Sequence, residues 1–485
     1  MQPVTDRGLL VGGQWEPGST ILPVHNPATG QLVAHYAVAT ADDVDRAATA
    51  AHTDGAAWTR MHPDERAKIL RRGAAAIRDN VDEIARILTL EQGKPVPDSR
   101  KEILFGAAVF DYYAEEGRRV QGSVRPNSSG QTMSLVTYHP IGTVAGIVPW
   151  NYPVDLYAWK VAPALAAGCP VIVKPPQEAP LAVGLVSRLL VEAGLPAGTL
   201  SDLPGGADVG QRLTTHPDIA MVTATCSTAT GKAIMRSAAD SLKRVSLELG
   251  GQCPLVVLPD ADVELAAAAA ARRSFSNMGQ ICIAVNRVIV HERVADAFVV
   301  ALARHVEGYT LGDPSQPGVA YGPCTTGAVV DKALSHIEDA VELGARIVTG
   351  GHPPQDPDLA DGHYFLPTVL DNVPQPALVM HDETFGPVLA VHRVNTIDEA
   401  IQVANSTDYG LAAYVYGQDL GIAMAVAERL EAGSVGINVN DVSELQAPFG
   451  GWKQSGIGRE LGPEGLFAYL ETKHTRLRRP VVPTD

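Results

Sequence analysis

The pattern of hydrophobic and polar positions contains two long segments in which strand and helix patterns alternate. In the first, residues 140–248, short apolar runs typical of buried strands are separated by helical patterns. The predicted strands are 144–148, 170–174, 199–203, 219–223 and 245–248, and the predicted helices are 154–167, 182–193, 208–214 and 230–239. This alternation predicts a parallel sheet with helices on both faces, which binds ligands at the carboxyl ends of its strands.

The second segment predicts another α/β domain. Its predicted strands are 255–258, 287–291, 346–349, 388–391, 412–416 and 434–438, and its predicted helices are 263–277, 294–307, 326–343, 397–404 and 420–431. Ahead of both segments, the pattern predicts a hairpin at 9–15 and helices at 41–58, 63–89 and 99–117. Residues 121–130 are rich in turn formers, and 132–138 alternate like a strand that either pairs with a neighbouring copy or forms an ordinary hairpin. Residues 475–485 predict a tail or an edge strand.

Composition narrows the possible functions. The 485 residues carry a formal net charge of −16, which argues against nucleic acid as the main partner. Five scattered cysteines suit a reducing compartment, and no spacing typical of metal ligands occurs. The N-terminus has no signal-peptide pattern, and the longest apolar run, 265–271, is too short to span a membrane. We therefore expect a cytoplasmic protein without a bound metal.

Two stretches carry candidate chemistry. Cys282 follows a Met-Gly-Gln turn, and Glu248 stands beside the Gly250–Gly251 pair. A thiolate is a strong nucleophile, and a carboxylate on a turn is placed like a general base. A lone cysteine is more often a small buried hydrophobe, and a lone carboxylate at a strand end more often faces solvent. Further motifs are needed to decide.

Those motifs resemble the NAD(P)-dependent aldehyde dehydrogenases, non-acylating type, over residues 9–473. They occur in the family's order at 149–153 (PWNYP), 164–169 (ALAAGC), 174–175 (KP), 247–251 (LELGG), 277–282 (NMGQIC), 383–387 (ETFGP) and 448–456 (PFGGWKQSG). The resemblance implies a Rossmann-type cofactor domain (1–120 and 140–247), an α/β catalytic domain (248–440) and a small bridging β-element (121–139 and 471–485). It also implies a homodimer or homotetramer.

The resemblance assigns roles to the catalytic residues. Cys282 attacks the aldehyde carbon, and the Asn151 amide with the Cys282 backbone N–H stabilises the oxyanion. Hydride leaves to the nicotinamide, and Glu248 activates the water that hydrolyses the thioester. Lys160 and Glu460 relay protons near Glu248. Because CoA-acylating relatives lack this glutamate, its presence indicates a product that is a free acid.

The implied cofactor is NAD or NADP, with a slight preference for NAD. Its expected contacts are Trp150, Lys174, Gln177, Gly206, Gly210, Ser227, Glu383 and Phe385. Gln177 stands where NAD-preferring members often carry Glu, and a neutral amide neither grips the ribose hydroxyls as a carboxylate does nor repels a 2′-phosphate. Cys226 and Ala224 stand where many members have Gly and Phe. We expect the Cys226 side chain to strain the turn or crowd the cofactor.

The substrate pocket is expected to be apolar and aromatic. Its predicted walls are Tyr152, Leu156, Trp159, Ile281, Ile283 and Phe449. The arginines that succinic semialdehyde dehydrogenases carry at the positions of Trp159 and Ser276 are absent, so a carboxylate tail lacks an obvious anchor. Acidic residues at 155, 441 and 444 keep an aminoaldehyde or betaine-aldehyde substrate open. Two other classes also remain open: a binding or structural protein that keeps the fold, and an esterase-like hydrolase that uses the same thiolate.

Overall fold

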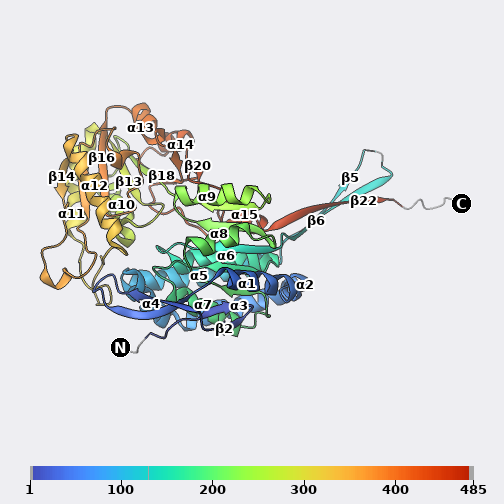
Figure 1. The fold of residues 1–485 in the computed structure, drawn as a ribbon. Coiled ribbons are helices and arrows are strands. Elements are labelled where there is room, and N and C mark those ends of the chain that lie inside the picture. Colours follow the sequence, from blue (N-terminus) through green and yellow to red (C-terminus); the bar gives the residue numbers. More distant parts are fainter. Residues whose placement is uncertain (1–3, 129, 480–485) are drawn as a thin grey trace.

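The computed structural model describes residues 4–128 and 130–479, which form two α/β bodies and a projecting β-arm (Figure 1). Residues 1–3, in the predicted cofactor domain, and residues 129 and 480–485, in the predicted bridging element, lie outside the described residues. Within the described part, no helix has both the length and the apolar composition needed to cross a membrane.

The first body is built on an eight-stranded sheet in the order β2-β1-β9-β8-β7-β10-β11-β21. The strands are β2 (Gln14–Glu16), β1 (Leu9–Val11), β9 (Leu200–Asp202), β8 (Val171–Lys174), β7 (Thr143–Ile147), β10 (Ile219–Thr225), β11 (Arg244–Glu248) and β21 (Gly456–Ile457). The strands from β9 to β11 run parallel, as predicted, whereas β1 and β21 are antiparallel to their neighbours. The carboxyl ends of the parallel strands therefore meet at one edge.

Helices cover both faces of this sheet. One face is covered by α1 (Ala41–Thr53), α8 (Ala207–Thr215) and α9 (Thr228–Ala239), and the other by α6 (Pro153–Ala167) and α7 (Leu181–Glu192). Further out lie α3 (Pro63–Asp79), α4 (Val81–Gln92) and α5 (Val96–Glu116), and the short α2 (Ala56–Arg60) follows α1. The apolar side chains between these layers form a continuous buried core.

Two predicted helices were too long. The pattern at 63–89 is divided by Asn80, whose ψ of 16° is not helical and which both ends α3 and precedes α4. Its side-chain amide donates to the Ala76 carbonyl at 2.8 Å and closes the end of α3. The pattern at 41–58 is also divided: α1 ends at Thr53 and α2 begins at Ala56, although Asp54 and Gly55 keep right-handed backbone angles. The apolar periodicity continues across both breaks, so periodicity alone could not locate them.

The second body contains a seven-stranded sheet in the order β14-β15-β16-β13-β12-β18-β19. The strands are β14 (Arg346–Thr349), β15 (Thr368–Asp371), β16 (Val388–Val394), β13 (Val285–His291), β12 (Cys253–Val257), β18 (Ala412–Tyr416) and β19 (Ser434–Ile437). All neighbours run parallel except β14 and β15. The sheet packs between α10 (Val263–Phe275) and α11 (Glu292–Glu307) on one side and α12 (Gly327–Glu342), α13 (Ile397–Asn405) and α14 (Leu420–Arg429) on the other. The prediction missed β15.

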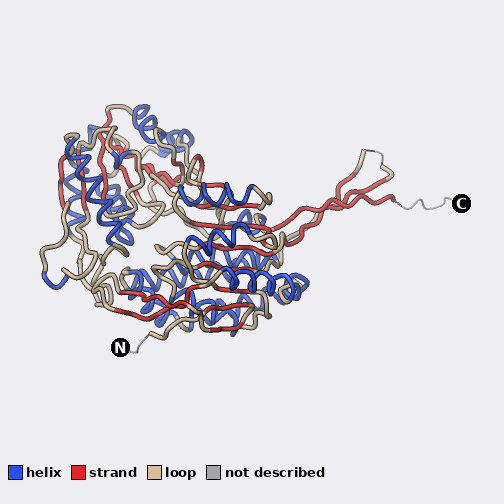
Figure 2. Tube along the Cα trace, in the orientation of Figure 1, coloured by secondary structure: helices blue, strands red, loops and turns tan. Residues whose placement is uncertain are grey.

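The projecting arm is a three-stranded antiparallel sheet in the order β22-β6-β5. It comprises β5 (Ser123–Pro126), β6 (Thr132–Pro140) and β22 (Leu470–Arg478), and Figure 2 shows it extending well beyond both bodies. The expected edge strand at the C-terminus is thus present but begins at Leu470, and part of the predicted turn region is β5. The smaller elements are β3 (Thr20–His25) with β4 (Leu32–Val38), β17 (Tyr409–Gly410) with β20 (Trp452–Lys453), α15 (Gly462–Phe467), and the 3-10 turns η1 (Ser276–Gly279), η2 (Pro357–Leu359) and η3 (Leu378–Met380).

Candidate active site

Cys282 lies on a tightly constrained loop between α10 and β13. Asn277, Met278 and Gly279 all have positive φ angles, of 48°, 56° and 76°. A side chain at Gly279 would place its Cβ 2.1 Å from the Gly386 carbonyl oxygen, so only glycine fits there. Left-handed backbone at residues other than glycine is unfavourable and persists only where surrounding contacts enforce it. The surrounding contacts therefore enforce the conformation of this loop, which sets the position of Cys282.

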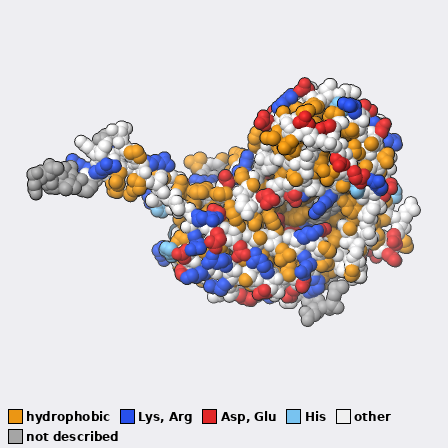
Figure 3. All heavy atoms as spheres, turned by 180° about the vertical axis from the view of Figure 1, so that it is seen from behind, with side chains coloured by type: hydrophobic (Ala, Val, Ile, Leu, Met, Phe, Trp, Pro, Cys, Tyr) orange, Lys and Arg blue, Asp and Glu red, His pale blue; other side chains and the backbone are white. Residues whose placement is uncertain are grey.

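Two cavities meet at Cys282. The first has a volume of about 220 Å³ and the second of about 490 Å³, and Asn151, Thr225 and Cys282 line both. Figure 3 shows a hollow between the two bodies in which hydrophobic side chains gather. A nucleophile at the junction of two cavities can contact one molecule in each, which is the arrangement that a reaction between a substrate and a cofactor requires.

Asn151 comes directly after the first-sheet strand β7 and just before α6. Its side-chain amide donates to the Gln280 carbonyl at 3.0 Å, and the residue is buried. An amide NH₂ group has two hydrogens, so this bond leaves one for an oxygen in the cavity beside Cys282. The structure thus brings together the candidate nucleophile Cys282 and the candidate oxyanion donor Asn151 from the two bodies.

Glu248 ends β11 and lines the first cavity without a good hydrogen bond. Among the described residues neither of its carboxylate oxygens has a well-formed partner, and the nearby Gly451 amide lowers its pKa only slightly. Burial, then repulsion by Glu460, raises the pKa of Glu248 well above its usual range, and Lys160 opposes that rise. Burial, followed by the charge of Glu248, also raises the pKa of the Cys282 thiol. The thiol therefore needs a base to ionise it.

Lys160 is fully buried on α6 and hydrogen-bonds two residues that line the first cavity. Its ammonium donates to Thr225 Oγ1 at 2.6 Å and to Glu460 Oε1 at 2.8 Å. It does not line the first cavity itself, but Thr225, Glu248 and Glu460 do. The arrangement places a buried Lys160–Glu460 ion pair close enough to Glu248 to affect its pKa.

The second cavity is lined by the predicted cofactor residues, with one exception. Trp150, Lys174, Gln177, Gly206, Ser227, Glu383 and Phe385 all line it. Gly210 does not; it lies on α8, where a Cβ would contact the Lys174 side chain at 3.7 Å. The Trp150 and Phe385 rings meet edge to face at 5.5 Å. Residues that sequence reasoning missed here include Glu178, Thr230 and Lys332.

This cavity fits a dinucleotide. The N-terminus of the twelve-residue helix α9 opens onto it, and Ser227 caps that helix by accepting from the Thr230 amide at 3.3 Å. Helix N-termini of this kind bind phosphate. Near Cys282, Glu383 accepts from the Gly251 amide at 2.8 Å, and burial raises the pKa of its carboxyl to about 7. A ribose or ring placed there would lie beside the nucleophile.

The predicted strain at Cys226 is not found. Cys226 has a negative φ, and its backbone N–H donates to the Glu248 carbonyl at 3.0 Å as the strands end. Its side chain does line the second cavity, and burial raises the pKa of the thiol to about 12, so it stays protonated. Crowding of the cofactor by the Cys226 side chain stays a prediction, whereas the expected strain of the backbone turn is absent.

The first cavity is lined by all six predicted substrate residues: Tyr152, Leu156, Trp159, Ile281, Ile283 and Phe449. Trp159 and Phe449 pack edge to face at 5.0 Å, and the Trp159 indole donates to Asp155 Oδ1 at 2.8 Å. Asp155 and Asp441 also line the cavity, whereas Glu444 does not. Burial, and then the charge of Glu102, raise the pKa of Asp155 well above its usual range, which weakens its case as a cation partner.

A cation that sequence reasoning missed also faces this cavity. Arg273 lies in the last turn of α10, three residues before Ser276, and its guanidinium pairs with Asp441 at 2.6 Å. Its Nε donates to the Asn440 carbonyl. The expectation that a carboxylate tail lacks an obvious anchor did not take this cation into account. The helical spacing of three residues from Ser276 is a signal that could have found it.

No cluster of side chains that could hold a metal ion occurs in the part of the chain described here.

The chain resembles known proteins along almost its whole length: a model of the aldehyde dehydrogenase family matches residues 15–475. 3-Sulfolactaldehyde dehydrogenase from Pseudomonas putida is 40% identical over 472 residues, 96% of each chain. Glutarate-semialdehyde dehydrogenase from Pseudomonas aeruginosa is 40% identical over 468 residues, also 96% of each chain. A solved NADP-dependent enzyme from E. coli has a TM-score of 0.95 at 38% identity, covering 97% of this chain and 98% of its own.

Proposed function

Because the chain belongs to the aldehyde dehydrogenase family and is an NAD(P)-dependent aldehyde dehydrogenase with that family's fold, we propose that its substrate is an aldehyde with an apolar or aromatic body. The supporting observation is the wall of the first cavity, which is lined by the apolar side chains of Trp159, Phe449, Leu156, Ile281 and Ile283 together with Cys282. Such walls bind apolar groups, and the few polar groups then fix orientation.

The chemistry proceeds on the residues of this cavity. Glu248 takes the proton of the Cys282 thiol, and the thiolate attacks the aldehyde carbon to form a thiohemiacetal. The Asn151 amide and the Cys282 backbone N–H hold the oxyanion. When bound, the nicotinamide ring supplies the hydride acceptor. Lys160 and Glu460 carry the thiol proton away from Glu248, which restores its carboxylate. Glu248 then deprotonates the water that hydrolyses the remaining thioester, the same pair carries this second proton away, and the acid leaves as the Cys282 thiolate is released.

The two bodies divide this work in the proposal. Residues 1–120 and 140–247 hold the cofactor, and residues 248–440 carry the nucleophile. Residues 121–139 and 471–485 join copies into a homodimer or homotetramer. Lys174, Gly206 and Ser227 line the second cavity, which supports the cofactor assignment. The projecting three-stranded arm supports the assignment of residues 121–139 and 471–485 to oligomerisation.

NAD is the proposed cofactor in preference to NADP. The Lys174 ammonium donates to the Gly205 and Pro175 carbonyls, at 2.9 and 3.2 Å, rather than standing free for a phosphate. Burial lowers its pKa, and the carboxylates of Glu178 and Asp208 partly offset this effect. Glu178 lines the second cavity. Two carboxylates near one lysine disfavour an additional 2′-phosphate by like-charge repulsion.

An aldehyde with an acidic tail is a second candidate, favoured by Arg273. In this candidate the Arg273 guanidinium, which lines the first cavity and pairs with Asp441, binds the carboxylate or sulfonate of the substrate. The two relatives from Pseudomonas, by their names, act on 3-sulfolactaldehyde and glutarate semialdehyde. A cationic aldehyde has weaker support because Asp441 is already paired with Arg273.

A matched set of aldehydes tests these alternatives. NAD(P)H formation is followed with hexanal, 6-oxohexanoate and a trimethylammonium aldehyde of equal chain length, with NAD and with NADP. The apolar proposal is supported if hexanal has the highest kcat/KM. The acidic-tail candidate is supported instead if 6-oxohexanoate has the highest kcat/KM and loses that preference in Arg273→Gln. Absence of NAD(P)H formation with every aldehyde, in a protein whose Cys282→Ala control behaves identically, contradicts both.

A further inference from the structure

A fully buried ion pair lies behind the proposed oxyanion donor, where Glu102 also forms part of the wall of the first cavity and Lys94 lines neither cavity. Lys94, on the link between α4 and α5, pairs with Glu102 on α5, and both side chains are 0% exposed. The Lys94 ammonium also lies 3.7 Å from the centre of the Tyr152 ring. Removing two charges from water is so costly that replacing such pairs by apolar residues often leaves proteins equally stable or more so. Stability alone therefore does not explain this pair.

Both members of the pair act on the start of α6. Lys94 Nζ donates to the Asn151 carbonyl at 2.7 Å, and Glu102 Oε1 accepts from the Val154 amide at 2.9 Å and the Asp155 amide at 3.3 Å. Helix α6 lacks a side-chain cap of its own at Tyr152. Glu102 thus serves as its cap from another helix, and a carboxylate is favoured at that helix end. The pair fixes where α6 begins.

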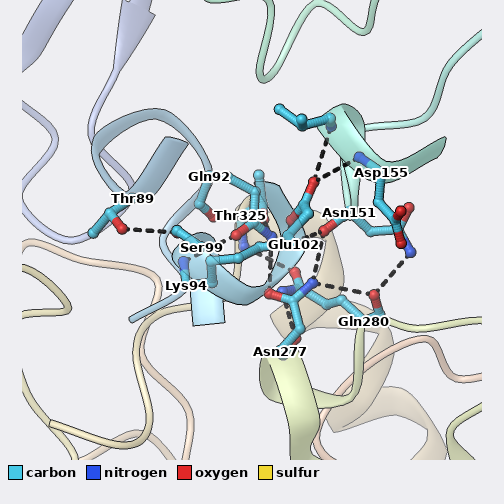
Figure 4. Close-up of polar contacts among 11 residues, drawn as sticks. Thr89, Gln92, Lys94, Ser99, Glu102, Asn151, Asp155, Asn277, Gln280 and Thr325 are labelled. Atoms are coloured by element: carbon cyan, nitrogen blue, oxygen red, sulfur yellow. Dashed lines mark hydrogen bonds and ion pairs between the residues drawn. The ribbon is translucent and has the colours of Figure 1, made fainter. Parts of the chain in front are cut away.

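The same network reaches the nucleophile loop, as Figure 4 shows. Asn277 Nδ2 donates to the Asn151 carbonyl at 3.0 Å and to the Gln280 carbonyl at 3.3 Å, and Asn151 Nδ2 donates to that same Gln280 carbonyl at 3.0 Å. On its other side, Gln92 Nε2 donates to Asn277 Oδ1 at 3.0 Å and to Thr325 Oγ1 at 3.1 Å. Asn151 is therefore held both through its backbone carbonyl and through its side-chain amide.

We propose that Lys94 and Glu102 form a positioning clamp that sets the Asn151 amide against the Cys282 loop, and that this clamp serves the oxyanion of the reaction. The inference rests on the proposed function of Asn151 as the oxyanion donor. An oxyanion donor stabilises the transition state only when it is held in place before the charge develops. A displacement of the start of α6 would move Asn151 without changing its chemistry.

A double-mutant cycle in kcat tests the clamp against Asn151. The clamp variant is Lys94→Met with Glu102→Gln, which removes both charges and leaves one amide oxygen as an acceptor for the Val154 N–H. In the clamp variant we expect kcat to fall about 10- to 100-fold, with a smaller change in KM. Asn151→Ala, which loses the oxyanion donor itself, should lower kcat by about 10²- to 10³-fold and sets the upper limit for the clamp effect. In the Asn151→Ala background the clamp substitutions should cost less than about threefold, because they act through Asn151.

The matched control is a second buried ion pair of the first body. Arg7 pairs with Asp202 at 2.5 Å, with side chains 5% and 0% exposed, and neither lines the two cavities at Cys282. Arg7→Met with Asp202→Asn should lower the thermal midpoint without the selective fall in kcat. If the double clamp variant does not fold, the cycle is run with Glu102→Gln alone.

Three results overturn the inference in distinguishable ways. A clamp effect that multiplies in full with Asn151→Ala shows that the pair acts elsewhere, and kcat within twofold of the parent shows that it does not position Asn151 at all; in both cases the proposed mechanism stands. If Asn151→Ala itself retains full activity, the oxyanion role proposed for Asn151 fails and the clamp fails with it. Coupling that cancels the clamp effect supports both.

Discussion

Glu460 should control the pH at which Glu248 works as a base. Burial and the like charge of Glu460 raise the pKa of Glu248, so at low pH its carboxyl is protonated and cannot accept a proton from water. Replacing Glu460 by Gln removes one of these causes and keeps the side-chain shape. It also frees Lys160, which donates to Glu460 Oε1 at 2.8 Å, to act on Glu248 unopposed. Both changes lower the pKa of Glu248.

The size of the shift follows from charge repulsion in a partly screened interior. Two like charges about 6 Å apart repel by roughly 3 kcal/mol at an effective dielectric constant of about 20. One pKa unit corresponds to about 1.4 kcal/mol, so removing such a charge lowers a neighbouring pKa by up to about two units. Because the fields of separate charges add, the presence of Lys160 does not change the sign. We expect the acidic limb of activity to move down by one to two pH units.

The assay is the pH profile of steady-state NAD(P)H formation under conditions in which thioester hydrolysis limits the rate. Glu248→Gln should remove the acidic limb, which identifies it. Glu444→Gln is the matched control, since Glu444 is an exposed carboxylate that does not line the first cavity. A limb that stays in place or moves to higher pH in Glu460→Gln refutes the argument, because it would mean that Glu248 is not the group that titrates.

Three further substitutions have expected outcomes. Gly279→Ala puts a Cβ 2.1 Å from the Gly386 carbonyl oxygen at φ +76°, so thermal unfolding should shift to lower temperature and activity should fall at least about tenfold; unchanged melting would contradict the steric reading. Glu178→Gln removes a carboxylate from the cofactor cavity, so the kcat/KM ratio of NADP to NAD should rise about tenfold, and a falling ratio would contradict the repulsion. Trp159→Ala should raise KM for hexanal by about 10- to 100-fold through lost apolar contact, whereas an unchanged KM would show that the aldehyde body binds elsewhere.

Much of the fold was predictable because its strands are buried on both faces. Runs such as Thr143–Ile147 and Val171–Lys174 are wholly or largely apolar and are bounded by turn residues, and they reappear as adjacent parallel strands. The helix break at Asn80 was not predictable, since the apolar stripe continues past it. Nor was β15 at Thr368–Asp371, a short strand whose parallel partner β16 is close in sequence but preceded by an irregular segment.

The site was predictable where a motif carried it and not where tertiary packing did. Cys282, Glu248 and Asn151 stand in motifs whose chemistry is readable from residue type. Arg273 and Lys94 stand in no such motif, and in sequence each resembles an ordinary charged residue of a helix or loop. Only the folded chain shows that Arg273 lines a cavity and that Lys94 is fully buried. Charges that look solvated along the chain are where sequence reasoning fails, because burial depends on segments far away.

The Gly250–Gly251 pair beside Glu248 is explained by crowding between the two bodies rather than by turn geometry. Neither glycine has a positive φ, so any residue could adopt the backbone. A Cβ at Gly250 would lie 2.5 Å from Glu383 Oε2, and one at Gly251 would lie 2.3 Å from the Cys282 carbonyl oxygen. The end of β11 is therefore pressed directly against the second body, and any side chain here would push Glu248 away from Cys282. The base and the nucleophile meet because these two positions have no side chain between them.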